Sequence, residues 1–63
     1  MEENKVYQYF EEMKSTIEEV QGDVEKFAGK GNGSAGTRVR KAMQTLKNLG
    51  QEIRKEISAQ KNG

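Results

Sequence analysis

The stretch GKGNGSAGTRVRK, residues 29–41, decides the fold, because it places four glycines within eight positions, between two segments of helical spacing. Glycine adopts backbone conformations that other residues avoid, so a cluster of glycines interrupts a helix. Gly31, Gly33 and Gly36 also match the G-x-G-x-x-G spacing of dinucleotide-binding turns. That pattern requires a buried strand in front of it, and residues 21–28 have helical periodicity instead. We therefore interpret the stretch as a hinge and expect no nucleotide cofactor.

Upstream of the hinge, apolar residues are spaced alternately four and three apart, which places them on one stripe of an α-helix. This spacing predicts a helix over residues 4–28, approximately, that ends at Gly29, since glycine is favoured just after a helix C-terminus. The predicted stripe consists of Val6, Phe10, Met13, Ile17, Val20, Val24 and Phe27.

Downstream of the hinge the same spacing recurs and predicts a second helix, from about residue 33 to about residue 60. Its stripe consists of Ala35, Val39, Ala42, Leu46, Leu49 and Ile53. Residues 29–33 then form a glycine-rich turn. The sequence predicts an all-α fold, an antiparallel two-helix hairpin that occupies residues 1–63 as a single domain.

A chain of 63 residues, 33% charged and 32% hydrophobic, buries little apolar surface as a monomer. It contains neither cysteine nor histidine, so we expect no disulfide and no metal site. In the helix predicted for residues 33–60, a second set of residues, spaced seven apart, lies beside the apolar stripe. It makes the apolar face wider than contact with one neighbouring helix requires. We therefore predict a homodimer that forms a four-helix bundle with coiled-coil packing. The predicted interface consists of Gly36, Met43, Gly50 and Ile57.

Gly50 has two interpretations, because glycine within a helix costs about 1 kcal/mol relative to alanine. It marks either a close crossing between subunits or a tolerated weak spot with a small bend.

Charge divides the chain in two. Residues 1–29 hold eight acidic and three basic side chains, a net charge of −5, and residues 30–63 hold two acidic and eight basic side chains, a net charge of +6. Much of the positive charge forms what we call the basic row, with a spacing of seven residues on one face of helix 2, and Lys41 and Lys55 lie beside it. The basic row consists of Arg40, Lys47, Arg54 and Lys61. The row is either a phosphate-binding surface or the solvated face that any soluble helix needs.

The start of helix 2 is a candidate anion site. Asn32 and Ser34 are both favoured N-cap residues, and the backbone N–H groups at a helix N-terminus attract phosphate. Thr37, Arg38 and Arg40 follow directly. Arg38 has an alternative role, because in an antiparallel hairpin it can pair with Asp23.

The sequence KGNGSAGTRVRK, followed by Leu46 and then by IRKEIS, resembles the short linker-histone-like chromatin proteins of chlamydiae and related bacteria. The matching residues are Lys30, Gly31, Asn32, Ala35, Gly36, Thr37, Arg38, Arg40, Lys41, Leu46, Arg54, Lys55 and Ser58. The resemblance covers residues 29–61, and it implies sequence-tolerant DNA binding and compaction of the nucleoid.

We therefore predict a non-enzymatic, histone-like protein that is cytoplasmic and nucleoid-associated and that binds the phosphate backbone of double-stranded DNA. The predicted contacts are Lys30, Asn32, Ser34, Thr37, Arg38, Arg40, Lys41, Lys47, Arg54, Lys55 and Lys61. We expect no catalytic residue, no cofactor, no small-molecule substrate and no membrane contact. The alternative is a helical protein–protein interaction module that binds no nucleic acid.

Overall fold

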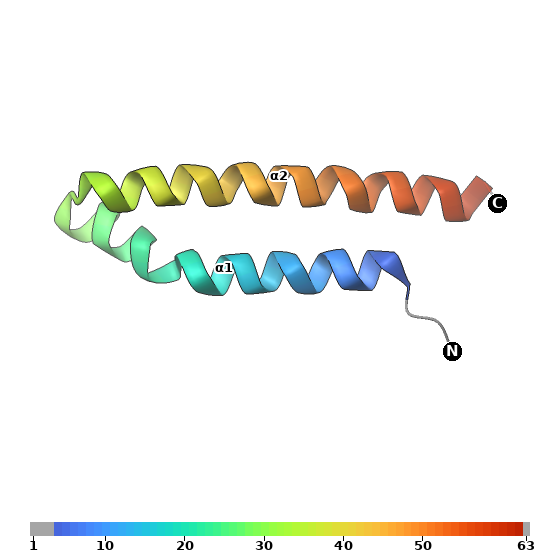
Figure 1. The fold of residues 1–63 in the computed structure, drawn as a ribbon, viewed down its shortest axis with the longest axis horizontal. Coiled ribbons are helices and arrows are strands. Elements are labelled where there is room, and N and C mark those ends of the chain that lie inside the picture. The colour runs from blue at the N-terminus through green and yellow to red at the C-terminus, as the bar shows by residue number, and fades with distance from the viewer. Residues whose placement is uncertain (1–3, 63) are drawn as a thin grey trace.

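The computed structural model describes residues 4–62, which form two long α-helices lying side by side and antiparallel (Figure 1). Helix α1 spans Lys5–Lys30 and helix α2 spans Gly33–Asn62. The prediction of an all-α two-helix hairpin is confirmed. The Cα positions extend over 48 × 20 × 12 Å, so the molecule is a flat rod with two broad faces. No helix within residues 4–62 is long and apolar enough to cross a bilayer.

The turn between the helices depends on Gly31, whose backbone is left-handed, with φ 68°. The Gly31 N–H donates to the Phe27 carbonyl oxygen at 3.0 Å, and the Asn32 N–H donates to the Lys26 carbonyl oxygen at 3.2 Å. These bonds satisfy carbonyl groups that the end of α1 leaves without helical partners. Helix α1 ends two residues after the predicted end near residue 28, because Gly29 continues the helix and Gly31 takes the left-handed conformation that stops it.

Helix α2 contacts α1 along the predicted stripe. Ala35 is fully buried, with 0% of its surface exposed, and the next five positions of the stripe are partly buried. Those five positions are Val39, Ala42, Leu46, Leu49 and Ile53.

The predicted stripe on α1 was correct only in part. Three of its seven members, Val6, Met13 and Val20, face α2, and Val20 is 7% exposed. The other members are about half exposed: Phe10 52%, Ile17 52%, Val24 42% and Phe27 52%. Their predicted places are taken by partly buried Tyr9, Thr16 and Asp23. Relative to the orientation that its apolar spacing predicts, helix α1 is therefore rotated about its own axis by about half the angle between neighbouring residues.

The open end of the hairpin is closed by a pair of side-chain amides. The Asn4 amide nitrogen donates to the Gln60 side-chain oxygen at 3.0 Å, and the Gln60 amide nitrogen donates back to the Asn4 side-chain oxygen at 2.9 Å. The same Asn4 oxygen caps α1 by accepting from the Val6 N–H at 2.9 Å. Asn4 thus fixes the start of α1 and its register against α2.

Candidate nucleic-acid interface

The beginning of α2 lies beside the turn and is capped by Asn32. The Asn32 side-chain oxygen accepts from the Ala35 N–H at 3.0 Å, and its carbonyl oxygen accepts from the Gly36 N–H at 3.2 Å. Ser34 and Thr37 are exposed, and the Thr37 hydroxyl donates to the Gly33 carbonyl oxygen at 3.4 Å. Of the two predicted capping residues, Asn32 therefore performs that role and Ser34 lies within the first turn.

The basic row runs along the exposed surface of α2. Its four members are exposed, and its middle lies beside a shallow hollow at Gly50. That hollow is lined by Met13, Lys47, Gly50, Gln51, Ile53 and Arg54. Nearer the turn, Arg40 borders a second hollow together with Phe27 and Gly36. The basic row therefore lies along one broad face of the hairpin, next to apolar groups from both helices.

The charges of this row are not neutralised within the described part of the hairpin. The ion pairs among the described residues are Lys14–Glu11, Arg38–Asp23 and Lys55–Glu52, and none of them uses a member of the basic row. Lys41 is also exposed. Lys55, which the sequence placed beside the row, lies 3.6 Å from the Glu52 carboxylate.

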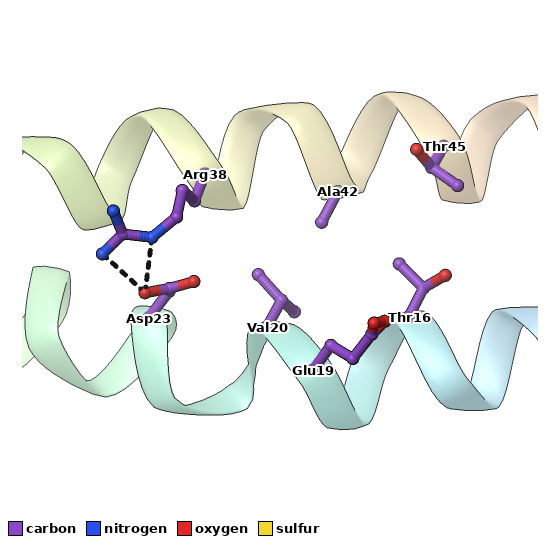
Figure 2. A pocket seen from close by; sticks show the side chains of 7 residues that line it. All are labelled: Thr16, Glu19, Val20, Asp23, Arg38, Ala42 and Thr45. Atoms are coloured by element: carbon purple, nitrogen blue, oxygen red, sulfur yellow. Dashed lines mark hydrogen bonds and ion pairs between the residues drawn. The ribbon is translucent and has the colours of Figure 1, made fainter.

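Arg38 lies outside the basic row and lines a hollow that contains no member of that row (Figure 2). Its Nε donates to the Asp23 Oδ1 at 2.9 Å, and a terminal guanidinium nitrogen lies 2.9 Å from the same oxygen. Both residues line a hollow between the helices together with Glu19, Val20 and Thr45. The alternative role considered for Arg38, an ion pair across the hairpin, is the one that the structure contains.

The four predicted interface residues of α2 differ in their surroundings. Met43 is 45% and Ile57 44% exposed, whereas Gly50 is partly buried and has no atom within 4 Å of the place of a Cβ. Helix α2 has no sharp kink along its length (Figure 1). At Gly36 a Cβ would lie 2.6 Å from the Phe27 ring, so that glycine makes room for a side chain of its own hairpin.

Sequence reasoning missed an apolar surface on α1. Phe10, Ile17 and Val24 were assigned to the contact with α2, but they are exposed. A signal for this was present in the sequence, because an Asp23–Arg38 ion pair requires Asp23 to face α2, and Asp23 and Val24 cannot both point the same way. We define the apolar face as Phe10, Ile17 and Val24 of α1 together with Met43, Gly50 and Ile57 of α2.

The described residues contain no cluster of acidic, histidine or cysteine side chains that could hold a metal ion. The exposed cations, the capped N-terminus of α2 and the neighbouring apolar groups form a surface suited to a large polyanion.

Comparison with known proteins gives one match. A family model described as histone H1-like protein Hc1 matches residues 7–63, which include nearly all of α1, the turn and the whole of α2. No curated protein and no solved structure matches the chain. The match agrees with the resemblance found in residues 29–61 and extends it over α1. On this evidence the chain belongs to the family of histone H1-like proteins Hc1.

Proposed function

We propose that this protein binds double-stranded DNA through the phosphate backbone and that the basic row of α2 makes the main contacts. The observation that carries the proposal is the row itself, a line of exposed cations outside the ion pairs of the described residues, in a chain of a histone-like family. Binding, rather than catalysis, is the function we assign, and it agrees with a place in the bacterial nucleoid.

The dimensions of the row suit a duplex. From Arg40 to Lys61 the row extends about 31 Å at 1.5 Å per residue, comparable with the ~34 Å turn of B-DNA. Arginine and lysine on a straight helix meet phosphates as a line of charges, and such contacts hold a protein on DNA without reading its sequence. We therefore expect binding that tolerates any base sequence.

Residues near the N-terminus of α2 add to this surface. The free backbone N–H groups of the first turn favour an anion, and Lys30, Ser34, Thr37 and Lys41 are exposed around them. Asn32 contributes indirectly, because its side chain holds the first turn. Arg38 and Lys55 contribute less, since each already lies against a carboxylate.

The same proposal includes self-association. Within the described residues only Val20 and Ala35 are buried, whereas the large side chains of the apolar face stay in solvent. A hairpin with so little buried surface gains stability from a second copy on that face. A homodimeric four-helix bundle, with Met43, Gly50 and Ile57 at the interface and Gly36 at its margin, is the assembly we propose.

The DNA-binding proposal is tested with a random-sequence duplex of 30 base pairs over a range of salt concentrations. The test variant replaces Arg40, Lys47 and Arg54 with Gln, and the control variant replaces the three α1 lysines Lys5, Lys14 and Lys26 with Gln. Both lose three positive charges, so only their positions differ. For the wild type we expect log K to fall steeply with log salt, and for the test variant a slope smaller by about 3, at roughly 0.9 per lost phosphate contact.

The control variant is expected to lose much less affinity and to keep most of the salt slope. Circular dichroism checks that both variants remain helical. Equal losses in the two variants would mean that net charge, and not the basic row, governs binding. Absence of binding by the wild type even at low salt would exclude DNA as the partner and favour a protein-interaction module.

A further inference from the structure

The apolar face includes residues from both helices, and these residues lie on the same side of the hairpin. Phe10, Ile17 and Val24 each follow by four positions a residue that faces α2, namely Val6, Met13 and Val20. Met43, Gly50 and Ile57 each follow by four positions a residue that faces α1, namely Val39, Leu46 and Ile53. Two antiparallel helices are related by a two-fold rotation about the normal to their common plane. Residues that follow the contact positions by four therefore point toward the same broad face on both helices.

The contacts in the hollows agree with this placement. Met13 lines the hollow at Gly50 together with Lys47 and Arg54, and Phe27 lines the next one together with Gly36 and Arg40. Glu19, Arg38 and Thr45 instead line a separate hollow, which includes no residue of the apolar face or of the basic row (Figure 2).

Charges of opposite sign border the two long edges of the apolar face. The basic row follows the edge formed by α2. The edge formed by α1 is followed by an acidic row, Glu11, Glu18 and Glu25, in which each residue comes one position after Phe10, Ile17 or Val24 and is exposed. Both rows repeat every seven residues. Each hairpin thus presents an apolar strip between a line of cations and a line of anions.

A two-fold symmetric pair can bring these faces together in two ways. With the two-fold axis parallel to the helices, α1 of each copy packs against α2 of the other, and each acidic row meets a basic row. With the axis across the helices, α1 packs against α1 and α2 against α2, and rows of equal charge meet. Like charges in contact disfavour association, so the charge pattern selects the first arrangement.

The register of the hairpin also fits the first arrangement. The pairs Asp23–Arg38 and Asn4–Gln60 set the register of the two helices. Along the long axis of the hairpin, Glu18 is therefore level with Gln44, and Glu11 is level with Gln51. A two-fold axis parallel to the helices leaves positions along that axis unchanged, so the partner copy's acidic residues are offset from Lys47 and Arg54 by about 4.5 Å along the axis, three residues of rise. Glu25 stands in the same relation to Arg40. The two rows are thus matched along their shared length.

The geometry points to a second copy of this chain as the occupant of the apolar face, with its acidic row against the basic row, so that self-association and DNA binding compete for the same cations. In the dimer without DNA, the carboxylates of the partner copy's acidic row pair with the cations that would otherwise bind phosphate. A duplex displaces the partner's acidic row and releases or rearranges the dimer. The competition depends on the DNA binding proposed above, whereas the arrangement of the dimer does not.

The test uses two variants of α1 with identical composition. Glu11→Gln with Glu18→Gln removes two charges from the acidic row, and Glu12→Gln with Glu19→Gln removes two charges from the adjacent positions, turned toward the opposite broad face. Sedimentation equilibrium without DNA gives the dimer dissociation constant of each. We expect it to rise about tenfold for the first variant, which loses two ion pairs on each side of the dimer, and to change little for the second. A monomeric wild type, or equal effects of the two variants, would overturn the arrangement.

A second measurement adds the duplex of 30 base pairs. Two fluorescent labels, one on each copy, report the dimer by energy transfer, and duplex titrated into the wild type is expected to reduce the transfer as it binds. The duplex affinity is expected to rise more for the Glu11/Glu18 variant than for the Glu12/Glu19 variant. Binding with undiminished transfer would overturn the competition. Absence of duplex binding would refute the proposed function and the competition with it, while the sedimentation result would still decide the arrangement.

Discussion

At the scale of the residue, the seven glycines of the chain are not equivalent. Gly31 has φ 68°, a conformation in which an L side chain is strained, although the space around it is open. Gly29 lies two positions earlier in helical conformation and also has open space around it. The backbone conformation, not the available room, therefore distinguishes the glycine that the turn requires from the glycine that it tolerates.

Alanine at these two positions is expected to have opposite effects on stability. Gly31→Ala should lower the free energy of unfolding by about 1 kcal/mol, since alanine must adopt a left-handed conformation. Gly29→Ala should raise it by about 0.5–1 kcal/mol, because alanine is favoured over glycine within a helix. Urea denaturation followed by circular dichroism measures both. A destabilised Gly29→Ala variant would contradict the helical assignment of that residue.

At the scale of the element, α2 carries basic side chains with two different tasks. Arg38 extends across to Asp23, whose side chain is only 18% exposed, and this contact orients the two helices. Arg40, two residues further along, belongs to the basic row on the other side of the helix. Helical geometry separates them, since residues two positions apart point to nearly opposite sides.

Substitution by Gln should separate these tasks. Arg38→Gln is expected to lower the free energy of unfolding by about 0.5–1 kcal/mol, as for a partly exposed ion pair, and to affect DNA affinity little. At a protein concentration low enough to keep the hairpin monomeric, Arg40→Gln is expected to leave its stability nearly unchanged, because Arg40 is outside the ion pairs of the described residues, and to weaken DNA binding. Denaturation and duplex titration at fixed salt compare the two. The idea of divided roles fails if Arg38→Gln costs as much DNA affinity as Arg40→Gln.

At the scale of the whole molecule, one hairpin is too thin to bury its own apolar side chains. Ile17 and Phe10 are each 52% exposed, and Met43 and Ile57, which belong to the same apolar face, are 45% and 44% exposed. Packing of that face against a second copy links folding to association, so stability depends on protein concentration.

The melting temperature is expected to rise by about 5 °C for each tenfold increase in protein concentration, a value set by the entropy of unfolding of two short chains. Ile17→Gln, which changes an exposed side chain of the apolar face, should remove this dependence. Ser15→Gln, on the exposed surface away from that face, should retain it. Differential scanning calorimetry over a hundredfold concentration range provides the measurement. A wild-type melting temperature independent of concentration would exclude the dimer.

The two helices, the break between them and the basic row could all be predicted from the amino-acid sequence. These features depend on local spacing: apolar residues at intervals of three and four, glycines clustered at 29–36, and cations every seven residues on α2. The capping residue Asn32 and the Asp23–Arg38 pair also followed from short-range rules and from the antiparallel geometry. The end of α1 was predicted less well, because two glycines two positions apart, Gly29 and Gly31, are both suited to end a helix.

The side of α1 that faces α2 could not be predicted from the sequence and is known from the packing of the two helices. Stripes through Phe10, Ile17 and Val24 or through Tyr9, Thr16 and Asp23 have the same alternation of three and four, so periodicity permits both. The choice between them depends on contacts between distant residues, the Asp23–Arg38 and Asn4–Gln60 pairs. Rotation of α1 toward these polar contacts moved its large apolar side chains to the surface, where they form one face with those of α2.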